Sequence, residues 1–252
     1  MLKKLLVVAT LTGLSGAVFA DETPALPFGL SVTGTAALTS DYRFRGVTQT
    51  FNDPAVQAGF VLSHASGAYA GVWGSNVDFG GTAHIELDPY IGYATTLDSF
   101  ANKPLLDVGL WYYAYPSESD LNWLELYGKL TFKDVLVQGA SLLTAVNYTN
   151  DYAGQNADSW NVNVGYSVPF GATGFGGVAG VGYTAVGEDK YKFNGEDSYV
   201  DWKAGVTYSF ASVSGLTAEL AAIGTNMETD GDYESSSRGV ETGAVFTLTK
   251  AF

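Results

Sequence analysis

The stretch His84-Ile-Glu-Leu-Asp-Pro-Tyr-Ile-Gly-Tyr93 decides the fold, because apolar and polar side chains alternate along it. The apolar series consists of Ile85, Leu87, Ile91 and Tyr93. The polar series consists of His84, Glu86 and Asp88. Alternation with a period of two over this length predicts a β-strand with one apolar face and one polar face.

The same alternation recurs as far as Phe252 and predicts about twelve strands, within a range of roughly ten to fourteen. Most candidates approach or slightly exceed the ~9–11 residues with which a tilted strand crosses a bilayer. The predicted ranges are 30–45, 54–64, 67–77, 83–95, 104–115, 121–132, 135–148, 159–168, 173–185, 198–209, 214–225 and 239–252.

The amino-terminal residues 1–20 have the pattern of a secretory signal peptide. Lys3 and Lys4 precede an apolar core, and Ala20 offers a small residue at the expected cleavage position. The apolar core is interrupted by glycine and is too short for a comfortable membrane anchor. We therefore expect cleavage after Ala20, a short lead over 21–29 and a single barrel domain over 30–252.

The composition excludes several classes of protein. The chain has 12 basic and 26 acidic residues and a net charge of −14, which argues against nucleic acid as a partner because phosphate backbones attract basic patches. It has no cysteine, so no disulfide framework is possible. No stretch of the chain after residue 20 reads as a membrane helix, because prolines, asparagines and glycines interrupt every long uncharged run.

These features predict an all-β fold, a transmembrane antiparallel up-and-down β-barrel of the bacterial outer membrane. Long acidic connections alternate with short, nearly neutral ones, as in barrels of that membrane. The last long connection alone holds Glu228, Asp230, Asp232 and Glu234. A soluble sandwich or barrel would alternate too. It is disfavoured because nearly every strand has an apolar face and no helix or second layer is predicted to cover it.

The polar faces of the strands predict a charged lumen. The expected pore-lining residues are Asp41, Arg43, Arg45, Glu86, Asp88, Asp107, Glu125, Lys129, Asp201, Lys203, Glu219 and Glu241. Eight acids against four bases predict a mild preference for cations, with Arg43 and Arg45 as a local positive constriction. The alternative is that these charges pair across the lumen and plug it.

Four aromatic residues lie at the alternate strand positions that are predicted to face the lumen: Trp111, Tyr113, Tyr115 and Trp123. Aromatic rings along a pore offer stacking surfaces for sugars or other flat solutes. The alternative, which the sequence favours, is an interfacial aromatic girdle or a shift of phase in one strand.

Signals for an enzyme are weak. His84, Glu86 and Asp88 are spaced to share one strand face and form the only candidate cluster for catalysis or metal binding. No serine partner is identifiable, so we expect no enzymatic activity, no metal and no cofactor.

The segment Thr39-Ser-Asp-Tyr-Arg-Phe-Arg-Gly-Val-Thr-Gln-Thr50, followed by Asp53-Pro-Ala-Val-Gln57, resembles the opening of the TorF-type porin family of proteobacteria. Residues Trp73-Gly-Ser-Asn-Val-Asp-Phe79 resemble the third strand of that family. The resemblance implies an outer-membrane barrel of porin type, but it supplies no solute and no residue roles. The terminal Phe252 is similar to the assembly signature of outer-membrane proteins, from which Lys250 departs.

The sequence therefore predicts a porin-like channel for passive diffusion of small hydrophilic solutes or ions. The alternative is a non-conducting structural or surface-binding barrel, whose acidic loops hold divalent cations that bridge lipopolysaccharide phosphates. A membrane-barrel enzyme is the third possibility. The expected partners are outer-membrane lipid, lipopolysaccharide and small solutes or ions, and the sequence leaves the oligomeric state open.

Overall fold

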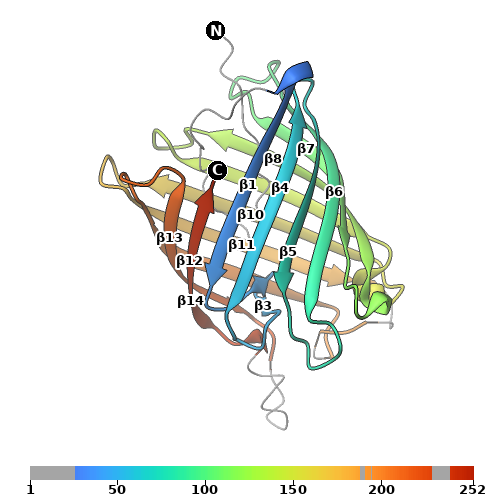
Figure 1. The fold of residues 1–252 in the computed structure, drawn as a ribbon. Helices are drawn as coiled ribbons and strands as arrows, with labels where there is room; N and C mark the ends of the chain where they lie inside the picture. Colours follow the sequence, from blue (N-terminus) through green and yellow to red (C-terminus); the bar gives the residue numbers. More distant parts are fainter. Residues whose placement is uncertain (1–25, 188–190, 194, 229–238) are drawn as a thin grey trace.

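The computed structural model describes residues 26–187, 191–193, 195–228 and 239–252. The expected signal peptide and most of the lead over 21–29 lie outside this part. Twelve long strands form one closed antiparallel barrel in the order β1-β14-β13-β12-β11-β10-β9-β8-β7-β6-β5-β4 (Figure 1). The predicted all-β class, the antiparallel topology and the number of strands are confirmed.

Each barrel strand pairs with its neighbours in the chain, and β1 pairs with β14 to close the wall. The strands are β1 (Leu30–Thr39), β4 (Ala55–His64), β5 (Ala68–Asn76), β6 (Ile85–Thr96), β7 (Leu105–Tyr113), β8 (Trp123–Lys133), β9 (Ser141–Thr149), β10 (Ser159–Pro169), β11 (Phe175–Val186), β12 (Ser198–Ser209), β13 (Leu216–Thr225) and β14 (Gly243–Ala251). In the described part of the chain, three short 3-10 turns accompany them: η1 (Pro27–Gly29), η2 (Ser119–Leu121) and η3 (Tyr152–Gly154).

The two ends of the barrel differ. We call the end with connections 40–54, 77–84, 114–122, 150–158, 187–197 and 226–242 the loop end. The opposite end, with connections 65–67, 97–104, 134–140, 170–174 and 210–215, is the turn end. Because the number of strands is even, β1 begins and β14 ends at the turn end (Figure 1).

The outer surface of the wall is an apolar band. Its members come from strands all around the barrel and include Val56, Ile91, Leu126, Trp160, Val181 and Leu220, each more than half exposed. Alternate residues on the same strands are buried inside, among them Glu86, Asp88 and Asn161. This arrangement is the inverse of a soluble barrel and matches a wall whose outer solvent is hydrocarbon.

Two predicted strands differ from the structure by six residues at one end, more than any of the others. The range 30–45 is too long, because β1 ends at Thr39 and the next residues leave the wall. The range 135–148 starts too early, because β9 begins at Ser141 and residues 134–140 form a turn. In that turn Leu136 has a positive φ of 66° and is 93% exposed, so the apolar run there is not a strand.

Candidate functional site

The first connection at the loop end folds into the barrel. After β1, residues 41–50 form a small hairpin in which β2 (Arg43–Phe44) pairs with β3 (Val47–Thr48). Arg45 and Gly46 at its tip both have positive φ, 49° and 83°, as a two-residue hairpin turn requires. We call residues 41–50 the plug hairpin. Figure 1 places β3 at the loop end, away from the carboxyl terminus.

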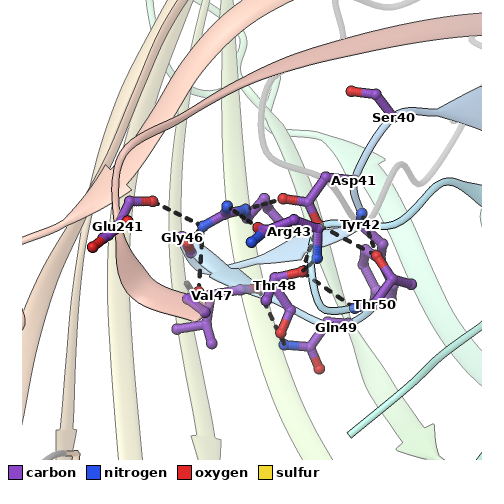
Figure 2. Close-up of polar contacts among 12 residues, drawn as sticks. Ser40, Asp41, Tyr42, Arg43, Gly46, Val47, Thr48, Gln49, Thr50 and Glu241 are labelled. Carbon is purple, nitrogen blue, oxygen red and sulfur yellow. Dashed lines mark hydrogen bonds and ion pairs between the residues drawn. The ribbon is translucent and has the colours of Figure 1, made fainter. Parts of the chain in front are cut away.

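Arg43 fixes the base of the plug hairpin through polar contacts (Figure 2) and is 8% exposed. Its guanidinium forms an ion pair with Asp41. Its other acceptors are Asn52 Oδ1 at 2.6 Å, the carbonyl of Gly46 at 3.1 Å, the carbonyl of Glu241 at 3.1 Å and the carbonyl of Gly239 at 3.3 Å. Arg43 thereby joins the hairpin to the segment that leads into β14.

The Asp41 carboxylate organises the rest of the hairpin. It accepts the Thr48 hydroxyl at 2.5 Å and the Thr50 hydroxyl at 3.3 Å, besides its pair with Arg43. The Thr50 hydroxyl also accepts the backbone N–H of Tyr42 at 3.2 Å. The Asp41 carboxylate and the Thr48 and Thr50 hydroxyls therefore all have partners within the hairpin, which helps a two-stranded hairpin persist away from the wall.

The tip of the plug hairpin reaches the walls around the lumen. Arg45 Nη2 lies 2.6 Å from Glu125 Oε2 on β8. A Cβ atom at Gly46 would lie 2.6 Å from the Thr225 methyl group at the end of β13. Burial disfavours the charge of Arg45, but the Glu125 carboxylate more than offsets this and raises the pKa of the guanidinium. The hairpin thus extends from β1 across the lumen to β8 and β13.

Aromatic rings fill the interior beside the hairpin. Phe44 packs edge-on against Tyr113 at 5.5 Å and against Trp123 at 6.4 Å between ring centroids. Tyr113 and Trp123 stack on one another at 4.1 Å, and Trp111 stacks on Tyr90 at the same distance. These parallel stacks form a packed aromatic cluster on this side of the loop end.

All four predicted lumen aromatics are buried inside the barrel, so the girdle alternative is wrong for them. The structure places Trp111 and Tyr113 on β7, Trp123 on β8 and Tyr115 in the loop after β7. Trp111 Nε1 donates to Asp88 at 2.9 Å, and the Tyr113 and Tyr115 hydroxyls face Glu125 and Glu86 at 3.3 Å. Their faces are occupied by protein neighbours, and binding of a solute to them stays a prediction.

An open cavity of about 980 Å³ occupies the rest of the lumen. Its lining begins at the plug hairpin, follows the inner faces of β7 to β14 and includes turn-end residues such as Gly139, Gly171 and Ser209. On the opposite side, Tyr69 and Trp73 of β5 and Tyr90 of β6 are buried on the inner faces of their strands. The lumen is therefore partly filled, and its open part leads from the turn end to the hairpin.

Nine of the predicted pore-lining residues border this cavity: Asp41, Arg43, Arg45, Asp107, Glu125, Lys129, Asp201, Lys203 and Glu219. Glu86 and Asp88 also point inward but are buried beneath the aromatic cluster. Glu241 does not: β14 begins only at Gly243, and Glu241 is exposed and contributes its backbone carbonyl to Arg43. The role of the inward residues in conduction stays a prediction.

Sequence reasoning missed two features of the lumen. It placed Arg43 and Arg45 on a barrel strand, whereas both belong to the plug hairpin. The excess length of the predicted strand 30–45 and the glycine at position 46 were available signals of a turn. It also missed an amide network in which the Asn147 and Asn163 side chains donate to Asn161 at 2.9 and 2.8 Å.

The candidate cluster of His84, Glu86 and Asp88 does not assemble. His84 precedes β6 and is exposed, whereas Glu86 and Asp88 are buried inside. Within the described ranges, no group of three His, Asp or Glu side chains is arranged to hold a metal ion. Nearby, the backbone N–H and hydroxyl of Thr82 donate to Glu118 and lower the pKa of its carboxyl, which ties two loops together.

The helical segments in the described part of the chain are too short or too polar to cross a bilayer. A closed wall of twelve tilted antiparallel strands with an apolar outside and a charged inside defines the class of outer-membrane β-barrels. Residues 21–252 match the model of the Gcw_chp family, described as bacterial proteins of unknown function, and the chain belongs to this family.

No match was found among curated protein sequences. Among solved structures, the NanC porin has 13% identity and a TM-score of 0.54, over 88% of this chain and 99% of that one. A membrane protein from a study of in-meso crystallisation has 12% identity and a TM-score of 0.51, over 87% and 83%. An outer-membrane channel from Pseudomonas putida F1 has 10% identity and a TM-score of 0.43, over 93% and 100%. The similarity to the first two extends to the barrel fold.

Proposed function

We propose that this protein is a porin-like channel of the bacterial outer membrane, through which small hydrophilic solutes or ions diffuse passively. The observation that carries the proposal is the cavity of about 980 Å³, which runs from the turn end to the plug hairpin between charged and amide side chains. Water-filled lumens of this kind distinguish channels from small barrels packed solid with side chains. The fold similarity to a porin and the resemblance of residues 39–57 to TorF-type porins support the same class.

The plug hairpin sets the narrowest point of the proposed path. A solute that enters at the turn end meets Arg45, Glu125 and Gly46 where the hairpin contacts the walls. It passes only beside the hairpin, along the inner faces of β9 to β13, or after the hairpin moves. We therefore expect a small conductance with discrete closures rather than a wide, steady pore.

We propose a mild preference for cations, which rests on the charge of the lining. Six acids and five bases border the cavity: Asp41, Asp107, Glu125, Asp134, Asp201 and Glu219 against Arg43, Arg45, Lys129, Lys133 and Lys203. Pairs such as Lys203 with Glu219 at 2.5 Å cancel much of this charge locally. A net excess of one acid supports a weak preference.

The test is the conductance of the purified full chain in planar bilayers, beside a variant in which residues 42–49 are replaced by a short Gly-Ser linker. A channel predicts small unitary steps for the wild type and several-fold larger steps for the shortened variant. A matched control replaces the turn 135–138 at the turn end by the same kind of linker and should leave the step size unchanged. If neither the wild type nor the shortened variant shows any conductance, the proposal is rejected.

A second candidate function is a non-conducting surface barrel, and one observation favours it. Arg43 makes five polar contacts, two of which hold the plug hairpin to the segment before β14, and aromatic stacks lie beside the hairpin. In that case the wild type is silent and only the shortened variant conducts. Outer-membrane lipid, with lipopolysaccharide at the acidic loops, would then be the partner to examine. We propose no catalytic activity for either the channel or the non-conducting barrel.

A further inference from the structure

Two carboxyl groups are buried side by side beneath the plug hairpin. Glu86 and Asp88 are two residues apart on β6 and therefore point to the same, inner, face of the strand. Their exposed fractions are 2% and 0%. Neither lines the open cavity, so they do not belong to the proposed solute path.

The partners of this pair are all neutral. Asp88 accepts Trp111 Nε1 at 2.9 Å and the backbone N–H of Ala114 at 3.1 Å. Glu86 accepts the Tyr115 hydroxyl at 3.3 Å through Oε1. The titratable groups that face the pair are the phenols of Tyr42 from the plug hairpin and of Tyr113 and Tyr115 from β7 and its loop. No lysine, arginine or histidine is among the described partners of either carboxyl.

One oxygen of the pair lacks a hydrogen-bond donor. Glu86 Oε2 is buried and accepts nothing, although the Glu86 and Asp88 side chains are in contact with each other. Two ionised carboxylates cannot bond to one another because neither carries a hydrogen. A single proton between them converts the same contact into a hydrogen bond and provides the missing donor.

The electrostatic free energy of the pair also favours one bound proton. Two buried negative charges in contact repel each other, and each also loses its hydration, which costs several kcal/mol per ion without a counter-charge. We propose that Glu86 and Asp88 share one proton, and that this proton keeps the plug hairpin docked through Tyr42. The pair is then a pH-sensitive latch inside the barrel, whether or not the barrel conducts.

Tyr42 connects the latch to the hairpin. Its side chain is 2% exposed, faces Glu86 and packs edge-on against Trp73 at 5.4 Å between ring centroids. Its backbone N–H is bonded to Thr50 within the hairpin. Loss of the shared proton places a second negative charge beside the Tyr42 hydroxyl, drives the two carboxylates apart and admits water. The docked hairpin is therefore favoured while the proton is bound and is loosened as the pH rises and the proton leaves.

Infrared spectroscopy of the full chain refolded in detergent tests the proton directly. The wild type should show a buried protonated-carboxyl C=O band at neutral pH that disappears at alkaline pH. Glu86→Gln and Asp88→Asn should each lose the band, because the N–H of the new amide replaces the shared proton as the donor to the remaining carboxylate, which then ionises. Glu241→Gln, an exposed carboxylate at the same end, should retain it. Absence of the band from the wild type, or its survival in both latch variants, would overturn the proposal.

Hydrogen exchange tests the link to the hairpin without relying on conductance. After correction for the chemical exchange rate, protection of the amides of residues 42–50 should fall about tenfold in the wild type between mildly acidic and alkaline pH. Glu86→Gln should show no such fall, and Glu241→Gln should follow the wild type. Protection that is independent of pH in the wild type would overturn the latch, even if the bilayer experiment shows a channel.

Discussion

Arg45 and Glu125 are 80 residues apart in the chain, and their side chains meet at 2.6 Å inside the barrel. Their side-chain exposures are 11% and 4%, so the pair is largely removed from water. It connects the tip of the plug hairpin to β8, on the far side of the lumen from the strands that carry the hairpin. The docked position of the hairpin therefore depends on a buried charge pair rather than on loop packing alone.

Removal of one partner of this pair should undock the hairpin. Arg45→Met removes the ion-pair partner of the buried Glu125 carboxylate and leaves it the Tyr113 hydroxyl and the electrostatic attraction of Lys129, and this loss costs up to about 3–5 kcal/mol. We expect faster hydrogen exchange of residues 42–50 and larger conductance steps. Lys103→Met is the matched control, because Lys103 pairs with Asp98 at 3.0 Å on an exposed turn and its removal costs only about 0–1 kcal/mol. Equal effects of the two substitutions would contradict this reading.

The turn of the hairpin has no room for a side chain. At Gly46 the backbone φ is 83°, and an added Cβ would lie 2.6 Å from the Thr225 methyl group and 2.9 Å from the Gly224 carbonyl. Gly46→Ala should combine the strain of a positive φ, about 1 kcal/mol, with a steric clash of about 1–3 kcal/mol that pushes the tip off the wall.

The control for this substitution is Gly171→Ala at the turn end. Gly171 also has a positive φ, 64°, but nothing lies within 4 Å of its Cβ position. Urea unfolding in detergent should therefore show the φ penalty alone for Gly171→Ala and a larger loss for Gly46→Ala. If both variants lose the same stability, the tip does not press against β13.

Much of the barrel was predictable because lipid on one face of a strand and water on the other determine which residue types alternate along it. A strand between hydrocarbon and a wet lumen must alternate, and the range 198–209 is the same in prediction and structure. The overrun of the first strand has a physical reason: Arg43 and Phe44 continue the alternation because they form a strand of the hairpin instead of the wall. Periodicity indicates that a segment is a strand, but it does not indicate which strand it pairs with.

For the site, the sequence predicted which residue types face inward but not how they pair. Inward charges follow from strand phase, but the choice of partner does not, since Arg45 meets Glu125 while Arg43 pairs with Asp41 two residues away. Such pairs depend on the inward fold of the first loop, which no local pattern specifies. The same holds for the buried pair on β6, because the lack of a basic partner among the described residues is a property of the assembled lumen.

The apolar band makes a prediction that is independent of the lumen. Ile91 lies near the middle of β6, faces outward and is 56% exposed. Ile91→Arg places a charge in hydrocarbon and should cost about 2–4 kcal/mol in lipid vesicles. Leu136→Arg, at a residue that is 93% exposed in a turn-end connection, should cost about 0–1 kcal/mol. A soluble barrel would tolerate both substitutions equally in buffer without lipid.

Ion selectivity should respond to single charges that line the cavity. Lys129 lines it, lies 4.3 Å above the Tyr127 ring and is paired in register with Asp107 on β7. Lys129→Gln removes a positive charge and leaves that of Asp107. Since one charge acts with about 1 kcal/mol at 4 Å in a water-like medium, the cation-to-anion permeability ratio should rise by up to about fivefold. Lys250→Gln is the control, because Lys250 points outward and bonds the Ser214 carbonyl at 2.6 Å. Reversal potentials in a salt gradient that shift equally for both variants would show that the measured path is not this cavity.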